Sequence, residues 1–197
     1  MKPEDFGWAS IEGVDPKIYK RAVIGNVPES ALPQGTIRLA EPKAYPVPYS
    51  FPFVENGWVN EVVVYQALER VNDQIAFWKE LYRICAHGAW VRLTSVYHSH
   101  IDAIADPTRK NRISERYFGY LSSAGRAQLR RDPFEDEIGC DIYGGVDFET
   151  KTIRHILEPE WEGFSDATRY EGLKRDMNVA SRIEVHLLAF KPARKEE

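Results

Sequence analysis

The chain contains 197 residues with a mass of 22.7 kDa, a length that suits one compact domain. Hydrophobic residues make up 43% and aromatic residues 12% of it, which excludes a disordered or fibrous protein. Lys and Arg number 26 against 30 Asp and Glu, so the net charge of −4 argues against a general electrostatic attraction to nucleic acid or acidic membranes.

The sequence shows no membrane span, no secretion signal and only two cysteines. No apolar run approaches the roughly 20 residues of a membrane span, and the first residues lack the form of a secretion signal, so we expect a cytoplasmic protein without a membrane anchor. Cys85 and Cys140 show no CxxC spacing, which predicts two buried thiols and no cysteine-based metal site.

The first third of the chain predicts two short strands with little helix between them. Arg21–Gly25 is apolar and ends on glycine, and residues 36–40 read as a second strand. Half of the 12 prolines lie between residues 28 and 52, which excludes a long helix there. Only about one helical turn, from Glu29 to Leu32, fits between the two strands.

Residues 59–96 predict one strand–helix–strand unit. Val59–Tyr65 is rich in β-branched residues, as is typical of a strand covered on both faces. Asn72 or Asp73 can cap a following helix that has an apolar stripe, and Gly88 can end this helix. Trp90–Val96 then reads as the next strand. Such a unit is the building block of an α/β sheet.

The remaining residues predict further alternation. Ser114 can cap a helix to about residue 122, residues 138–143 and 152–157 read as antiparallel strands, and a helix from about residue 165 to 180 precedes a last strand at 183–190. No internal linker is evident, so we expect a single domain over residues 1–197 with a shortened, proline-rich part at 1–55.

Several short motifs in the central third occur in a characteristic order. They are Phe51-Pro52-Phe53, Leu68-Glu69, Phe77 to Arg83, His87-Gly88, Asp106-Pro107-Thr108 and Phe118-Gly119-Tyr120. This stretch resembles one small-molecule branch of the class I S-adenosylmethionine-dependent methyltransferases. The resemblance implies a Rossmann-like, mostly parallel sheet of seven strands whose last strand is antiparallel, with S-adenosylmethionine as cofactor and methyl transfer as activity.

The resemblance also assigns a cofactor site at the ends of the first strands. Its residues would be Gly25, Glu41, Tyr65 and Gln66, with Glu41 accepting hydrogen bonds from the ribose hydroxyls. A solvated loop carboxylate is the alternative for Glu41. The chain departs from the family in having one glycine in residues 25–30, where a glycine-rich turn is usual, and Asn60 where an aspartate is usual.

Two arginines stand where the family carries histidines. Leu-Glu-His of the family is Leu68-Glu69-Arg70 here, and Asp-Pro-Thr-His ends on Arg109. We hypothesise that Arg70 and Arg109 bind an anionic group of the ligand, with Tyr97 in the same acceptor site, while solvated arginines are the alternative.

The segment after the strand at 90–96 is the richest in chemical groups. In an extended backbone His98, His100 and Asp102 would point to one side, and Asp106 follows. If the protein is a methyltransferase, His98 or His100 would remove a proton from the acceptor, with Asp102 and Asp106 nearby. A lesser alternative is a metal-dependent hydrolase that uses His98, His100 and Asp102, and a hydrogen-bonded structural loop is the third.

The sequence therefore predicts methyl transfer from S-adenosylmethionine to a small polar or anionic acceptor. The alternative is a methyltransferase-like protein that has lost ordinary cofactor binding and serves another reaction or a partner. Short basic clusters near residues 109–112 and 126–131 are followed by acidic residues, so nucleic acid is not the expected partner. Homo- or hetero-oligomers are left open.

Overall fold

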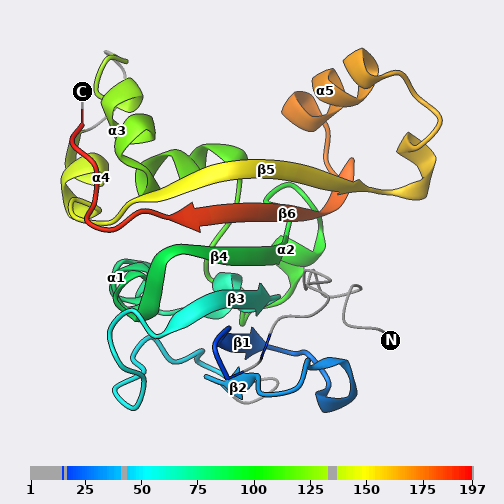
Figure 1. The fold of residues 1–197 in the computed structure, drawn as a ribbon. Helices are drawn as coiled ribbons and strands as arrows, with labels where there is room; N and C mark the ends of the chain where they lie inside the picture. The colour runs from blue at the N-terminus through cyan, green and yellow to red at the C-terminus, as the bar shows by residue number, and fades with distance from the viewer. Residues whose placement is uncertain (1–14, 16, 41–43, 133–136, 197) are drawn as a thin grey trace.

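The computed structural model describes residues 15, 17–40, 44–132 and 137–196, which share one six-stranded sheet (Figure 1). Its order is β2-β1-β3-β4-β6-β5. The strands are β1 (Arg21–Gly25), β2 (Ile37–Arg38), β3 (Val59–Tyr65), β4 (Cys85–Val96), β5 (Phe148–Leu157) and β6 (Ala180–Ala189). Pairings β2–β1, β1–β3 and β3–β4 are parallel, and β6 is antiparallel to both of its neighbours. The expected mostly parallel sheet with an antiparallel last strand is confirmed, with six strands among the described residues rather than seven.

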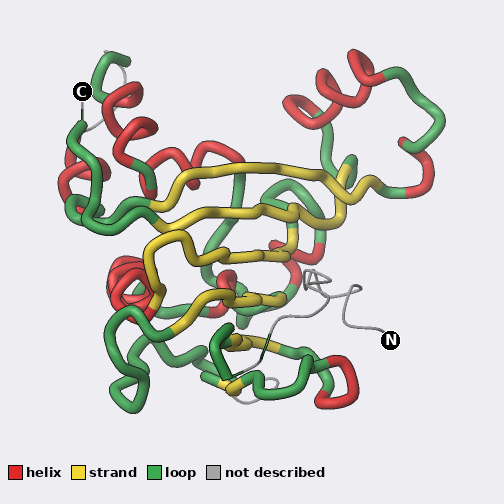
Figure 2. The backbone as a smooth tube through the Cα atoms, viewed as in Figure 1, coloured by secondary structure: helices red, strands yellow, loops and turns green. Residues whose placement is uncertain are grey.

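The helices are short and lie mainly around the ends of the sheet (Figure 2). They are α1 (Gln74–Ile84), α2 (Asp102–Ala105), α3 (Ser123–Leu129), α4 (Glu137–Ile142) and α5 (Asp166–Arg175), with 3-10 turns η2 (Glu29–Ala31), η3 (Leu68–Arg70), η4 (Glu115–Leu121) and η5 (Pro159–Trp161). Within the described ranges, no helix is both long and apolar enough to cross a membrane.

Helix α1 forms where its sequence pattern predicts. The Asp73 side chain accepts a hydrogen bond from the Ala76 N–H at 2.9 Å, which caps the first turn. Phe77, Trp78 and Leu81 are fully buried because they share the face that packs on the sheet. The helix is therefore held by tertiary packing on one face of β3 and β4.

The core is unequal on the two faces of the sheet. The larger cluster includes Ile24, Val62 and Val64 together with the buried face of α1. The smaller cluster on the opposite face contains Val23, Val27, Ala31 and Val63. Because the segment after β1 is a single 3-10 turn, little helix is available to cover that second face.

The matched motif at residues 51–53 has a structural explanation. Arg83 of α1 donates to the carbonyl oxygens of Phe51 at 3.0 Å and Val54 at 2.8 Å, and to the Asn56 side chain at 2.6 Å. Glu80 pairs with Arg83 and accepts the Phe51 N–H at 2.7 Å. The spacing of Glu80 and Arg83 thus fixes the turn before β3 to the end of α1.

Several predicted boundaries are wrong. Residues 138–143 were expected as a strand, but helix α4 spans Glu137–Ile142, and β5 begins at Phe148 and pairs with β6 instead. Helix α1 ends at Ile84 rather than at Gly88, which lies inside β4 with φ +76°. The segment after Ser114 is a 3-10 helix without a side-chain cap. Cys85 and Cys140 are free and buried, as predicted.

Helix α5 projects away from the sheet near the end where α2 lies (Figure 1). The Ser165 side chain caps it by accepting the Thr168 N–H at 3.3 Å. Gly172 is the buried residue of the helix, and a Cβ at this position would lie 2.5 Å from the Trp161 ring. The connection between β5 and β6 thus has a small packing contact of its own.

Candidate functional site

A cavity of about 350 Å³ lies at the carboxyl ends of β1 and β3. Its lining residues come from the ends of both strands, from the segment between β2 and β3, and from the loop after α2: Gly25, Asn26, Ala44, Tyr45, Val47, Gln66, Ala67, Arg70 and Thr108. The chain leaves β1 toward β2 on one side, whereas β3 and β4 lie on the other side. This is the position at which open α/β sheets bind ligands.

Gly25 and Gln66, two of the residues that the resemblance assigns to a cofactor site, line this cavity, and Tyr65 immediately precedes Gln66 at the end of β3. Gly25 has φ +105°, and a Cβ there would lie 2.0 Å from the Tyr65 carbonyl oxygen. The contact with β3 therefore explains the glycine without any ligand. Glu41 lies outside the described residues.

The segment after β1 lacks the helix N-terminus whose N–H groups could bind a phosphate or a carboxylate. Arg38 of β2 donates to the carbonyl oxygens of Gly25 at 3.2 Å and Val27 at 2.7 Å, and its Nε bonds to Glu29 at 2.9 Å. The helix that would present N–H groups is reduced to η2, from Glu29 to Ala31. The segment after β1 is thus held in place by the Arg38 side chain.

Arg70 supplies a positive charge on the cavity wall. Its Nη1 donates to the Gln66 carbonyl at 2.9 Å, its Nε to Thr108 Oγ1 at 3.1 Å, and its Nη2 to Asp106 Oδ2 at 3.1 Å. The side chain is 22% exposed. Three partners from two loops therefore orient the guanidinium, and the cavity can present it to a ligand.

Asp106 holds the two hypothesised anion-binding arginines together. Arg109 Nε lies 3.3 Å from the same Oδ2 atom that Arg70 contacts, and Arg109 Nη1 donates to the Asp102 carbonyl at 2.8 Å. Hydrogen bonds from Thr108, together with that from Arg70, lower the pKa of Asp106 to about 2. Arg70 lines the cavity, whereas Arg109 does not. Asp106 therefore acts on the cavity through Arg70 rather than as a proton acceptor.

The histidine loop is folded rather than extended. Asp102 begins α2, and its N–H donates to His100 Nδ1 at 3.1 Å. His100 Nε2 lies 3.4 Å from Glu158, so both ring nitrogens have a polar neighbour. Among the residues that the structure describes, no group of three His, Cys, Asp or Glu side chains could hold a metal ion. The three residues of the hydrolase alternative are thus not arranged as a ligand set.

His98 belongs to a different cluster, at the end of β4. Its ring lies against the Tyr97 ring with centroids 4.4 Å apart. Burial lowers the pKa of His98, while the charge of Glu115 opposes this shift and the charges of Arg112 and His155 add to it. A half-buried imidazole with a lowered pKa is neutral at pH 7 and can accept a proton.

Glu115 and His155 join this cluster, and sequence analysis missed both. Tyr97 donates its hydroxyl proton to Glu115 Oε1 at 2.9 Å, and the His155 ring bonds to the same oxygen. Burial acts to raise the pKa of Glu115, but the hydrogen bonds from His155 and Tyr97 outweigh it and lower the pKa to about 2. No local pattern could reveal this network because its members are up to 58 residues apart in sequence, from Tyr97 to His155.

Glu69, next to Arg70, is 1% exposed. Its Oε2 accepts the Ser95 hydroxyl at 2.8 Å, and its Oε1 has no hydrogen-bond partner. Burial raises its pKa despite the opposing hydrogen bonds and nearby arginines. Burial therefore favours the neutral form of this carboxyl group, which belongs to the same turn as Arg70.

No protein-family model matches this chain, and no curated protein matches it in sequence. Three solved structures illustrate its similarities. A complex between the Haloferax volcanii Trm112 methyltransferase activator and a proposed methyltransferase is matched at 12% identity and a TM-score of 0.48, over 88% of this chain and 83% of that chain. A proposed S-adenosylmethionine-dependent methyltransferase from Listeria monocytogenes gives 12% and 0.46, over 88% and 91%.

The third is an arsenic(III) S-adenosylmethionine methyltransferase from Chlamydomonas reinhardtii, at 9% identity and a TM-score of 0.46, over 98% of this chain and 72% of that chain. All three TM-scores lie below 0.5.

Proposed function

We propose that this protein transfers a methyl group from S-adenosylmethionine to a small anionic acceptor. The observation that carries the proposal is the cavity at the carboxyl ends of β1 and β3, which has an oriented arginine on its wall. Of the motifs that resemble the methyltransferase branch, Leu68-Glu69 and Asp106-Pro107-Thr108 lie at this end of the sheet, beside Arg70. Phe51-Pro52-Phe53 lies before β3, at the opposite end. When bound, the cofactor supplies an electrophilic methyl group on a sulfonium.

The described lining residues fit parts of this cofactor. The cavity volume of about 350 Å³ falls in the range of small-molecule sites. Asn26 and Gln66 offer side-chain donors and acceptors, and Tyr45 offers an aromatic surface. Arg70 suits a carboxylate, which both the cofactor and an anionic acceptor can present.

The proposed proton acceptor is His98. It lies two residues after the end of β4, the neighbour of β3, and its lowered pKa favours the neutral ring. His100 is less suited because its two nitrogens face the Asp102 N–H and Glu158. Asp102 remains a proposed contributor, Asp106 acts by orienting Arg70, and Arg109 pairs with Asp106.

A second function is favoured by Arg38. This arginine binds the carbonyl oxygens of Gly25 and Val27, and only η2 follows β1, so the usual N–H cradle is missing. A methyltransferase-like protein that binds a different anionic ligand would keep Arg70 without needing that cradle. Nothing in this alternative requires a methyl donor.

Calorimetric titration with S-adenosylmethionine separates the two functions. A ligand present at 100 times its Kd raises the free energy of unfolding by about 2.7 kcal/mol, which thermal melting detects. We expect binding by the wild-type protein and at least tenfold weaker binding by Arg70→Ala. Arg154→Ala, whose side chain is 70% exposed, is the matched control and should bind normally. Absence of heat and of any melting shift with the wild-type protein would refute the methyltransferase proposal.

A further inference from the structure

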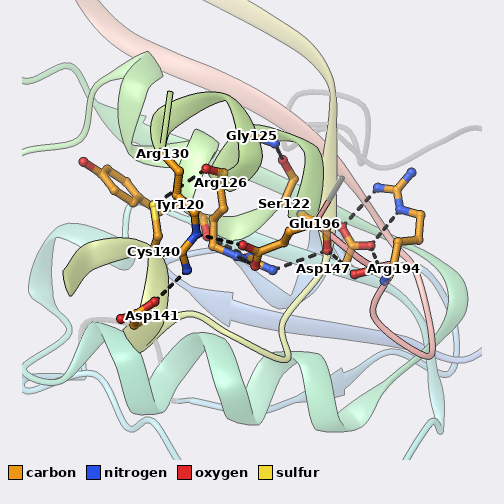
Figure 3. Close-up of polar contacts among 11 residues, drawn as sticks. Tyr120, Ser122, Gly125, Arg126, Arg130, Cys140, Asp141, Asp147, Arg194 and Glu196 are labelled. Carbon is orange, nitrogen blue, oxygen red and sulfur yellow. Dashed lines mark hydrogen bonds and ion pairs between the residues drawn. The ribbon is translucent and has the colours of Figure 1, made fainter. Parts of the chain in front are cut away.

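Two buried charges, Arg126 of α3 and Asp147 before β5, are both paired with residues 194–196 (Figure 3). Arg126 is 1% exposed and Asp147 is fully buried. They lie at the end of the sheet where α3 and α4 gather, opposite the end where α2 lies (Figure 1). This cluster is therefore separate from the cavity described above.

The Glu196 carboxylate lies between two guanidinium groups. Its Oε1 is 2.5 Å from Arg126 Nε, and its Oε2 is 3.1 Å from Arg130 Nε. Burial acts to raise the pKa of Glu196, but hydrogen bonds from the two arginines outweigh it and lower the pKa. One carboxylate thus engages both cations, an arrangement typical of strong arginine–carboxylate recognition.

The two arginines are held in place without Glu196. Arg126 Nη1 donates to the Tyr120 carbonyl at 3.0 Å and its Nη2 to Ser123 Oγ at 3.3 Å. Arg130 Nη2 donates to Asp141 Oδ1 at 2.6 Å. These contacts orient the guanidinium groups toward the position of the carboxylate, so removal of the Glu196 side chain leaves a preformed pair of donors.

The backbone near Glu196 is anchored independently. Arg194 donates to Asp147 Oδ2 from its N–H at 3.0 Å and from Nε at 2.7 Å, and to Oδ1 from Nη2 at 3.0 Å. Ser123 donates its hydroxyl proton to the Arg194 carbonyl at 2.8 Å. Glu196 follows this anchor by two residues, so its side chain can leave the arginines while Arg194 remains bound.

We propose that Arg126 and Arg130 form a carboxylate-binding site that Glu196 fills within the chain and that an acidic segment of another polypeptide can fill in its place. Arg126 requires a negatively charged partner because a buried cation without one is strongly unfavourable. The Glu196 side chain, in contrast, is 25% exposed and can exchange its pairing for water. The site therefore has a fixed buried half and a replaceable outer half.

Chemical rescue tests the site. Glu196→Ala removes the carboxylate, and we expect its melting temperature to fall below that of the wild-type protein. Sodium acetate should restore part of the loss in a saturable manner, whereas sodium chloride at the same ionic strength should not. Lys195→Ala, which changes an exposed neighbour, is the matched control and should show neither the fall nor the rescue. Glu196→Gln provides a milder variant if the alanine variant does not fold.

The partner is tested with an acetylated tri-glutamate amide. We expect it to bind Glu196→Ala at least tenfold more tightly than the wild-type protein, because Glu196 competes for the arginines. Adding Arg130→Gln, a change at a 30% exposed side chain, should weaken both acetate rescue and peptide binding. Equal effects of acetate and chloride on Glu196→Ala would overturn the carboxylate site. Acetate rescue without peptide binding would overturn the polypeptide partner.

Discussion

The close approach of β1 and β3 at the cavity makes Gly25 the most sensitive backbone position of the site. An alanine Cβ there would lie 2.0 Å from the Tyr65 carbonyl oxygen and 3.2 Å from the Ala67 Cβ, with φ at +105°. The unusual φ costs about 1–3 kcal/mol, and relief of the clash by backbone movement adds about 1–3 kcal/mol. We expect Gly25→Ala to lower the free energy of unfolding by about 2–6 kcal/mol, measured by urea denaturation.

Gly88→Ala is the matched control. Gly88 also has a positive φ, +76°, but a Cβ there would meet nothing within 4 Å. Both variants place a Cβ at a positive φ and reduce the entropy of the unfolded chain, so the excess destabilisation of Gly25→Ala reports the clash with β3 together with the added strain of φ +105°. Equal destabilisation of the two variants would refute the argument that contact between β1 and β3 requires Gly25.

Three further predictions concern stability. Arg83→Ala should lower the free energy of unfolding by about 2 kcal/mol through the loss of charged hydrogen bonds to residues 51–56, while exposed Lys79→Ala should change it by less than about 0.5 kcal/mol in the same urea assay. Tyr97→Phe should cost about 1 kcal/mol because it removes the hydroxyl that donates to Glu115, and an unchanged urea midpoint would contradict this. The pKa values of Glu115 and Asp106 are lowered to about 2, so their stabilisation is complete above the unfolded values of about 4 and is lost as pH falls from about 4.5 to 2. Glu115→Gln should make the acid unfolding curve shallower in that range.

The strand–helix–strand unit of residues 59–96 could be predicted because its signals are local. A β-branched run, the Asp73 cap and the buried stripe containing Trp78 and Leu81 all favour the same elements. The strand predicted at residues 138–143 is wrong because a short run with apolar residues fits a helix or a strand equally well. In the helix Ile138 is exposed and Cys140 is buried. Burial of Cys140 depends on its packing against the backbone at Arg126.

The candidate site was only partly accessible to sequence reasoning. Gly25, Gln66 and Arg70 follow strand ends, so the strand order alone brings them to one cavity. The alternation of His98 and His100 assumed an extended backbone, whereas a turn leads directly into α2. Their partners Glu115 and Glu158 lie on later elements, and only the tertiary fold assigns each histidine to a different network.

Arg70 and Arg109, which stand where the methyltransferases that the sequence resembles carry histidines, have unequal consequences once their shared partner is known. Both face Asp106 Oδ2, so two permanent positive charges are offset by one carboxylate, and one positive charge remains in excess. Arg70 lines the cavity, whereas Arg109 does not line it and donates to the Asp102 carbonyl. Asp106 is therefore shared between the two guanidinium groups and does not neutralise Arg70 alone. The second replacement thus strengthens the first, and the pair favours an anion more than Arg70 would alone.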